Sequence, residues 1–460
     1  MASIIERKGH YCVVYSFIDE NGQKKQKWET YKSAADAKRR RKEVEYRQEI
    51  GKFVVPQCKT MEDLLREYVS LYGKNTWAIS TYQSNVSLID NYIKPIIGHL
   101  KLSEVTTRVL EKFYQQLLRT KAVPKKYFGK ASGEKTGFVS ASTVREINKL
   151  LRNCFNQAVK WELMEKNPCV NATLPKVNHQ AREIWTADTL FQAIEVCDDT
   201  RLKLALNIAF SCSLRIGELL GLTWDCVIIT TECIENGTAY IYINKEIQRV
   251  SRDILETLEG KDVITIFPAS SEKTKTVQVL KTPKTVSSIR KVYLPRTVAE
   301  MLVEWKKEQD EAKELLGAEY TDYNLVFAGP FGMPTEGARI RSAMKKLIDK
   351  NDLPPVVFHS LRHSSITYKL KLNGGDIKAV QGDSGHSQAQ MVTDQYSHII
   401  DENRAHNAQL FEDAFYNHKD VEPKATQPDL PVAGIDPELL SKVLQSPELL
   451  ALLQALGQKK

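Results

Sequence analysis

The chain has 460 residues with a hydrophobic fraction of 42%, and it carries 65 Lys and Arg against 57 Asp and Glu, a formal net charge of +8. This globular composition excludes a chain that is disordered throughout, and the length predicts roughly two to four domains. No apolar run approaches the ~18 residues of a membrane span, and the N-terminus lacks the apolar stretch of a secretion signal. The eight Cys lie between positions 12 and 233 without a CxxC pair, which favours free thiols in a reducing cytosol.

The positive charge is concentrated near the N-terminus, where residues 1–59 hold fourteen Lys and Arg against eight Asp and Glu, a net of +6. Residues 11–17 alternate as a strand does, Asn21-Gly22 predicts a hairpin turn, and residues 24–30 form the returning strand. A helix is expected after Ser33. A basic sheet and helix favour binding to nucleic acid through counterion release, although a solvated, charged helix face would carry the same residues.

Residues from Thr60 to about Lys176 follow a helical pattern, after a linker at 54–57. We expect four helices here, with N-termini capped by Thr60, Ser80, Thr106 and Ser142. Residues 124–137, between the third and fourth helices, are rich in Lys and Gly, which is typical of a loop. This segment is therefore predicted to form a four-helix domain.

From about Ala181 the pattern mixes helices with short strands. Helices are expected at 187–196, 200–212, 297–316, 336–350, 360–373 and 376–382, and strands at 239–249, 262–267, 276–281 and 290–294. After Tyr416 the chain becomes a Pro-containing linker at 417–437, and Asp436 and Ser446 then each precede a short Leu-rich helix. The apolar faces of these two helices need a partner, which could be the same chain or another protein.

Residues able to carry chemistry gather toward the C-terminal third, where five of the nine His lie between positions 359 and 406. His359 and Arg362 are three apart at the start of a predicted helix, so both reach one face at an end that favours anions. His386 follows Gly385 after a tight turn, and Tyr396 comes ten residues later.

A second basic element stands upstream, where Arg215 heads a short helix and Glu218 lies one turn further on, able to orient the guanidinium. Two Arg and two His around a Tyr suit attack on a phosphodiester, because guanidinium groups stabilise charge developing on phosphate and a Tyr hydroxyl is a nucleophile once nearby cations lower its pKa. No carboxylate cluster suggests Mg²⁺, so this chemistry would need no metal. Two other interpretations stay open: each residue could be structural, or His359 and His363, four apart, could begin a zinc site.

In order and spacing, over roughly residues 180–400, these motifs resemble the signature of the tyrosine recombinases, and most closely integrases of temperate phages and conjugative transposons of Gram-positive bacteria. The resemblance rests on Arg215-Ile-Gly-Glu-Leu, His359-Ser-Leu-Arg362-His, Gly385-His386 and Tyr396-Ser-His. It implies that Arg215 and Arg362 are the two catalytic arginines and that Tyr396 is the nucleophile. It also implies that His359 occupies the family's His-or-Lys position and His386 its His-or-Trp position. It also implies that a lysine on a β-hairpin protonates the leaving 5′ oxygen, assigned to Lys284 with Lys281 and Lys275 as rivals. Many relatives have Leu where this chain has Ser384, which we expect to serve packing.

The resemblance implies a multidomain α+β architecture. Residues 1–56 would be a small β-sheet-plus-helix domain that binds arm-type DNA sites, residues 57–176 a four-helix core-binding domain, and residues 177–416 a mixed, mainly α catalytic domain with a small antiparallel sheet. Residues 417–460 would be the linker and the Leu-rich tail. The expected DNA contacts of the first domain are Lys24, Lys25, Lys27, Arg39, Arg40 and Arg41.

The implied reaction is site-specific recombination that integrates or excises a mobile element through a 3′-phosphotyrosine intermediate and a Holliday junction, without a metal or ATP. The implied partners are double-stranded DNA at core and arm sites, three further copies in a homotetramer, and an excisionase or host DNA-bending protein, in the cytoplasm of a bacterial host and away from membranes. The alternatives are a DNA-binding regulator on the same scaffold that no longer cuts, a type IB topoisomerase and, more remotely, a zinc-dependent hydrolase.

Overall fold

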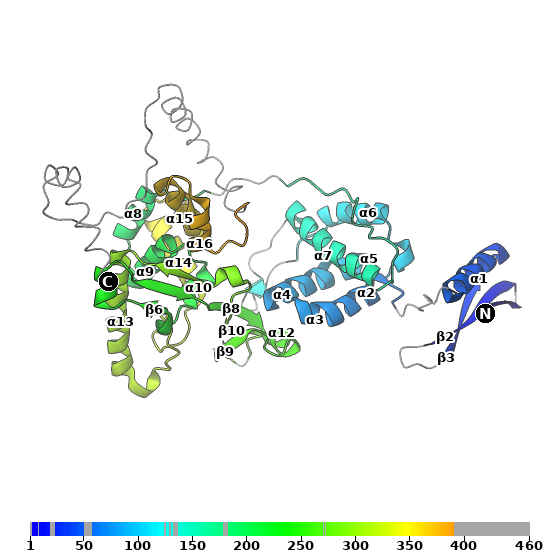
Figure 1. Ribbon diagram of the computed structural model, residues 1–460, viewed down its shortest axis with the longest axis horizontal. Helices are drawn as coiled ribbons and strands as arrows, with labels where there is room; N and C mark the ends of the chain where they lie inside the picture. Colours follow the sequence, from blue (N-terminus) through cyan, green and yellow to red (C-terminus); the bar gives the residue numbers. More distant parts are fainter. Residues whose placement is uncertain are drawn as a thin grey trace, which may run out of the picture. The chain divides into compact units, whose positions relative to one another are not determined.

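The computed structural model (Figure 1) describes residues 2–7, 9–18, 24–49, 58–123, 126–127, 130–131, 137–177, 183–269, 271 and 273–390. Several predicted features lie outside the described residues: the Asn21-Gly22 turn, the linker at 54–57, most of the loop at 124–137, Tyr396 and the whole tail at 417–460. No helix of the described residues is both long and apolar enough to cross a membrane.

A three-stranded antiparallel sheet and one helix open the chain. The sheet has the order β1 (Ser3–Arg7), β2 (His10–Ile18) and β3 (Lys24–Tyr31), and α1 (Ala34–Glu49) packs on it. Val13, Tyr15, Ala37 and Val44 are buried between them. The pattern did not predict β1, since this strand is short and mostly exposed, but it pairs with β2 along its whole length.

Four helical stretches follow in the described part of residues 58–177, and the first two contain a π turn. They are α2 (Met61–Glu67), η1 (Tyr68–Gly73) and α3 (Lys74–Thr76); α4 (Ile79–Leu88), η2 (Ile89–Ile93) and α5 (Lys94–Ile97); α6 (Thr107–Leu118); and α7 (Ala141–Lys160). A 3-10 turn, η3 (Leu102–Glu104), precedes α6, and short strands β4 (Lys126–Tyr127) and β5 (Lys130–Ala131) precede α7.

Two of the four expected N-terminal caps of these helices are confirmed. Thr60 and Thr106 cap α2 and α6 through their hydroxyl groups. Ser80 and Ser142 are wrong, because α4 begins after Ala78 without a side-chain cap and α7 begins after Ser140. The hydroxyl of Ser140 accepts a hydrogen bond from the N–H of Thr143 at 3.2 Å, so the helix takes the earlier of two serines with the same capping chemistry.

In the described part of residues 183–390, helices pack against two antiparallel sheets, ordered β8-β10-β9 and β11-β7-β6 (Figure 1). The strands are β6 (Val227–Ile228), β7 (Tyr240–Ile243), β8 (Glu246–Ser251), β9 (Val263–Ile266), β10 (Thr276–Lys281) and β11 (Arg290–Tyr293). The α-helices are α8 (Ala187–Glu195), α9 (Thr200–Ser211), α10 (Ile216–Leu220), α11 (Thr231–Glu235), α12 (Arg252–Thr257), α13 (Arg296–Leu316), α14 (Gly337–Lys350), α15 (Phe358–Leu372) and α16 (Ile377–Ser384). Three 3-10 turns complete the set, η4 (Trp224–Cys226), η5 (Val286–Ser288) and η6 (Gly317–Glu319).

The six helices expected in this region are present, with ends that move by one or two residues. The strand expected at 239–249 is two strands, β7 and β8, which turn at Asn244-Lys245 and enter different sheets. Buried Ile241, Ile243 and Ile247 continue the same alternation through the turn, so the pattern carries no sign of the break.

Two clusters of buried apolar residues lie in the described part of residues 58–390. One cluster unites apolar residues from α8, α9, α10, α14 and the start of α15. The other unites the helices of residues 61–160 with Val250, Leu255, Val277 and Val279 of the β8-β10-β9 sheet and α12. The site described below depends on α10, α15, α16 and the start of β11.

Candidate active site

Arg362 is the centre of the site, near the start of α15, with 1% of its surface exposed. Its Nη1 donates to the carbonyl oxygen of Ser213, and its Nη2 donates to the carbonyl oxygen of Ser384 at 2.6 Å. The same Nη2 lies 3.2 Å from Nε2 of His386. One buried guanidinium therefore joins the segment before α10, helix α15 and the turn after α16.

His386 is held by the turn that ends α16, where Gly385 adopts the left-handed conformation with φ of +65°. Because a guanidinium can only donate, Nε2 accepts from Arg362 and the ring proton lies on Nδ1. That proton points at the hydroxyl of Ser384, 2.8 Å away, and the hydroxyl donates to the carbonyl oxygen of Gln381 at 3.3 Å. Ser384 is fully buried, yet it also orients the imidazole, a role beyond the packing expected of it.

Burial, together with the nearby cations Arg362 and Arg215, lowers the pKa of His386 to about 4. The imidazole is therefore neutral at neutral pH in the free protein. Hydrogen bonds connect these elements: Arg362 contacts the ring of His386 and also donates to the carbonyl oxygen of Ser213, two residues before Arg215.

Arg215 precedes α10 and is half-buried, with its carboxylate partner one turn along the helix. Nη1 of Arg215 donates to Oε1 of Glu218 at 2.6 Å, and the backbone N–H of Arg215 donates to Oε2 at 3.1 Å. Burial alone would raise the pKa of Glu218, but the cations Arg290 and Arg215 hold this pKa below its usual value. The helix lies tightly against β8, because a Cβ on Gly221 would come within 2.7 Å of the Cα of Glu246.

His359 is exposed on α15, and its ring meets that of His363 edge to face, with centroids 4.9 Å apart. Within the described residues, no group of three or more His, Cys, Asp and Glu is placed to hold a metal ion. Tyr396, the predicted nucleophile, lies outside the described residues.

Lys284 is exposed in the connection between β10 and β11, and its Nζ donates to Oγ1 of Thr81 at 3.1 Å. The expected hairpin is wrong, because β10 pairs with β8 and β9 whereas β11 pairs with β7. The rival Lys281 is buried and binds Oε1 of Glu246 at 3.0 Å. The other rival, Lys275, is exposed just before β10.

Arg290 is the site residue that the sequence reasoning missed. It is buried at the start of β11 and donates to the same carboxylate, Glu218, that holds Arg215. A signal was present: Arg290 occupies an alternate position with Val292 and Leu294, which are both buried. A charged residue on the apolar side of a strand indicates a buried polar contact.

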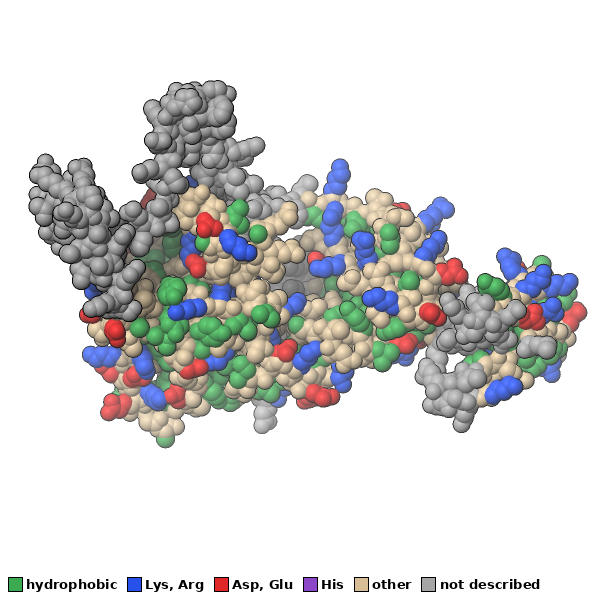
Figure 2. Space-filling model, in the orientation of Figure 1, with side chains coloured by type: hydrophobic (Ala, Val, Ile, Leu, Met, Phe, Trp, Pro, Cys, Tyr) green, Lys and Arg blue, Asp and Glu red, His purple; other side chains and the backbone are tan. Residues whose placement is uncertain are grey.

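The predicted DNA contacts near the N-terminus lie on β3 and α1, and Figure 2 shows Lys and Arg side chains gathered over α1. They are Lys24, Lys25, Lys27, Arg39, Arg40 and Arg41. Arg40 binds Glu29 through Nε at 2.8 Å, and Arg39 pairs with Asp36 at 2.5 Å. Lys24 shares the face of β3 with exposed Trp28, whereas Lys27 shares the face with Glu29 toward α1. The six contacts stay a prediction.

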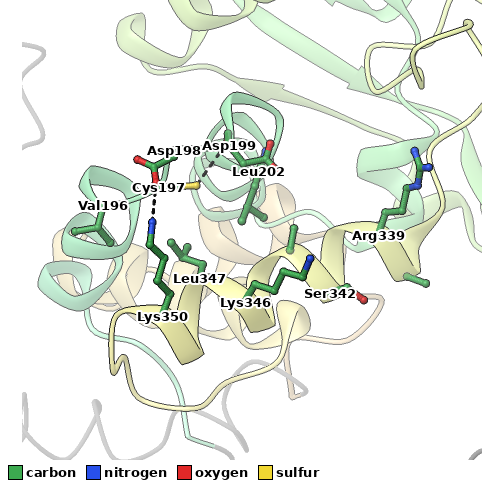
Figure 3. Close-up of a pocket in the computed structure, with 12 residues that line it drawn as sticks. Val196, Cys197, Asp198, Asp199, Leu202, Arg339, Ser342, Lys346, Leu347 and Lys350 are labelled. Atoms are coloured by element: carbon green, nitrogen blue, oxygen red, sulfur yellow. Dashed lines mark hydrogen bonds and ion pairs between the residues drawn. The ribbon is translucent and has the colours of Figure 1, made fainter.

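A cavity of about 500 Å³ lies between α14 and the segment joining α8 to α9 (Figure 3). It contains the ion pair between Lys350 and Asp198, at 3.0 Å, and the buried thiol of Cys197. Of the predicted catalytic residues that the structure describes, none lines it.

Comparison with known proteins agrees with the motifs. Residues 185–403, which include every predicted catalytic position, match the Phage integrase family, and residues 60–118 match "Phage integrase, N-terminal SAM-like domain". The chain is 27% identical to a "Tyrosine recombinase XerC-like" protein of Caldanaerobacter subterraneus over 412 residues, 86% of this chain and 94% of the relative. It is 22% identical to the ICEBs1 integrase of Bacillus subtilis over 72% of this chain and 77% of the relative.

Among solved structures, the Tn1549 transposon integrase in complex with a circular intermediate DNA aligns with a TM-score of 0.57 at 17% sequence identity. The alignment covers 76% of this chain and 99% of that chain, so the two share a fold. The predicted integrase-like fold, mostly helical with small antiparallel sheets, is thereby confirmed.

Proposed function

Because the chain belongs to the phage integrase family of tyrosine recombinases, we propose that it integrates or excises a mobile element by cutting and rejoining DNA at specific sites. The convergence of Arg362 and His386, with Arg215 near enough to lower the pKa of that imidazole, supports this most directly. Such a set of donors suits a phosphate whose negative charge grows during attack.

The guanidinium groups of Arg215 and Arg362 bind the non-bridging oxygens of the scissile phosphate and stabilise the pentacoordinate transition state. The hydroxyl of Tyr396 attacks phosphorus, a 3′-phosphotyrosine bond forms and the bond to the 5′ oxygen breaks. Lys284 protonates the leaving oxygen, and His359 and His386 donate hydrogen bonds or accept the proton that the Tyr396 hydroxyl loses.

The freed 5′-hydroxyl then attacks the phosphotyrosine of a partner duplex, which restores the DNA backbone and releases Tyr396. The phosphotyrosine conserves the energy of the broken bond, so no ATP is consumed. Two such rounds, through a Holliday junction, exchange both strands within a homotetramer.

The proposed division of labour follows the predicted segments. Residues 1–56 bind arm-type sites, residues 57–176 and 177–416 enclose the core site, and residues 417–460 supply the tail. The match of residues 60–118 to an integrase N-terminal domain supports the second assignment. An excisionase or a host DNA-bending protein, and a place in the bacterial cytoplasm, stay predictions.

The experiment that tests this function looks for a covalent protein–DNA adduct. A core duplex is first selected from a randomised pool by binding to the full chain, and it is then nicked so that the cleaved end diffuses away and traps the intermediate. Wild type, Tyr396→Phe and a matched control, Tyr368→Phe, are incubated with it in EDTA. Tyr368 is exposed on α15, which makes it a fair control for loss of a hydroxyl.

An adduct that survives denaturant with wild type and Tyr368→Phe, but not with Tyr396→Phe, supports the proposal. An adduct that persists in Tyr396→Phe shows that another residue is the nucleophile. Tight binding without any adduct points to the non-cutting regulator, and relaxation of supercoiled DNA without exchange between two duplexes points to a topoisomerase.

A further inference from the structure

Arg290 is a buried cation that the proposed chemistry does not use. Only 7% of its surface is exposed, at the first residue of β11. A guanidinium is tolerated in such a place only when other groups balance its charge and accept its hydrogen bonds. The groups that accept its hydrogen bonds therefore indicate the role of Arg290.

Three acceptors surround this guanidinium. Nη2 donates to Oε2 of Glu218 at 3.0 Å, Nε donates to the carbonyl oxygen of Asp383 at 2.7 Å, and Nη1 donates to the carbonyl oxygen of Ser288 at 2.9 Å. The first acceptor belongs to α10, the second to α16, and the third to the turn before β11.

Two of these acceptors support predicted catalytic residues. Glu218 holds Arg215, with Oε1 on its guanidinium and Oε2 on its backbone N–H. Arg290 occupies Oε2 as well, so it fixes the rotation of the carboxylate that orients Arg215. On the other side, Asp383 begins the turn that carries His386. Arg290 also packs closely against Gly385 in this turn, because a Cβ on Gly385 would lie 3.0 Å from Nη1 of Arg290.

We propose that Arg290 is a positioning residue that holds Arg215, through Glu218, and His386, through the turn at Asp383 to Gly385, in one arrangement around the scissile phosphate. Arg290 itself does not contact DNA in this reaction. The inference rests on the proposed roles of Arg215 and His386, and it adds the connection between them.

A substrate that differs only in charge separates positioning from folding. In a methylphosphonate, a methyl group replaces one non-bridging oxygen of the scissile phosphate and removes its negative charge. A guanidinium aimed at that charge then matters less, so a variant whose defect is a misplaced Arg215 should recover on this substrate, as Arg215→Ala should. A variant that is merely less folded loses the same fraction of activity on both substrates.

The variants are Arg290→Met, which removes the cation, and Arg290→Lys, which keeps the charge without the fork of donors. Arg296→Met is the control, because Arg296 is exposed at the start of α13 and pairs with Glu300 one turn along the same helix. Should Arg290→Met fail to fold, Arg290→Lys, which keeps a cation beside Glu218, carries the test.

We expect Arg290→Met to slow adduct formation on the phosphodiester by about 10- to 100-fold, the scale of a misplaced catalytic group, while core-site binding changes by less than about threefold. On the methylphosphonate the deficit should shrink to about threefold or less, and Arg290→Lys should fall between wild type and Arg290→Met.

An Arg290→Met that cleaves the phosphodiester at the wild-type rate overturns the inference. So does an equal loss on the two substrates, since that result means a structural role alone. If neither wild type nor Arg296→Met forms an adduct, the proposed function fails, and this inference fails with it.

Discussion

Acidification from about pH 7.5 to about pH 5 should destabilise the protein by about 2 kcal/mol through His386 alone. This imidazole has an ordinary pKa of 6.5 when unfolded, and burial beside Arg362 and Arg215 lowers the pKa to about 4 in the folded protein. As the pH falls below 6.5, His386 binds a proton in the unfolded chain but not in the folded protein. Each pH unit therefore lowers the free energy of unfolding by about 1.4 kcal/mol. The loss ends near pH 4, where both states are protonated.

Urea unfolding of wild type and His386→Gln at both pH values measures this effect. Gln cannot titrate, but it can still accept from Arg362 and donate to Ser384, so the difference between the two proteins isolates the imidazole from the carboxylates. His386 should also show no titration above pH 5 in NMR spectra, with its signal assigned by its absence from the variant. Equal losses in both proteins, or a midpoint near 6.5, would refute the reasoning.

Two further changes test the surroundings of the site. Gly385→Ala should lower the free energy of unfolding by about 1–2 kcal/mol in urea, because Gly385 has a φ of +65° and a Cβ would crowd Arg290; an unchanged unfolding midpoint contradicts this. Lys284→Ala should slow adduct formation on a normal nicked duplex by about 100-fold, the usual scale of general acid catalysis, and regain most of the rate when sulfur replaces the leaving 5′ oxygen. Sulfur departs without a proton, so a defect of Lys284→Ala that persists on the sulfur substrate shows that this lysine is not the general acid, and Lys281→Ala then becomes the variant to test.

The site residues that could be predicted from the sequence are those whose position in a local motif indicates their role. Arg215, Arg362 and His386 stand at helix ends and a Gly turn, which local rules predict, and hydrogen bonds of Arg362 join their elements. Arg290 depends on contacts with α10 and α16, which no local pattern contains. The resemblance implies a hairpin around Lys284, but β10 and β11, the strands on either side, pair with other strands.

The same limit applies to the ends of elements. Ser140 and Ser142 offer equal capping chemistry, and the helix begins after Ser140. A single alternation ran through β7 and β8, although the chain turns between them and changes sheet. Each error arises where tertiary contacts choose between local alternatives of nearly equal free energy.

The site is closed by contacts between residues far apart in the chain: Arg362 binds a carbonyl 149 residues earlier, and Arg290 binds one 93 residues later. Long-range contacts of this kind form late, after large loops have closed. During synthesis, a chain that has not reached residue 383 lacks the acceptors at Asp383 and Ser384, and it must bury two guanidinium groups without them. Such incomplete chains therefore cannot assemble the arrangement of Arg290 and Arg362 seen in the full chain.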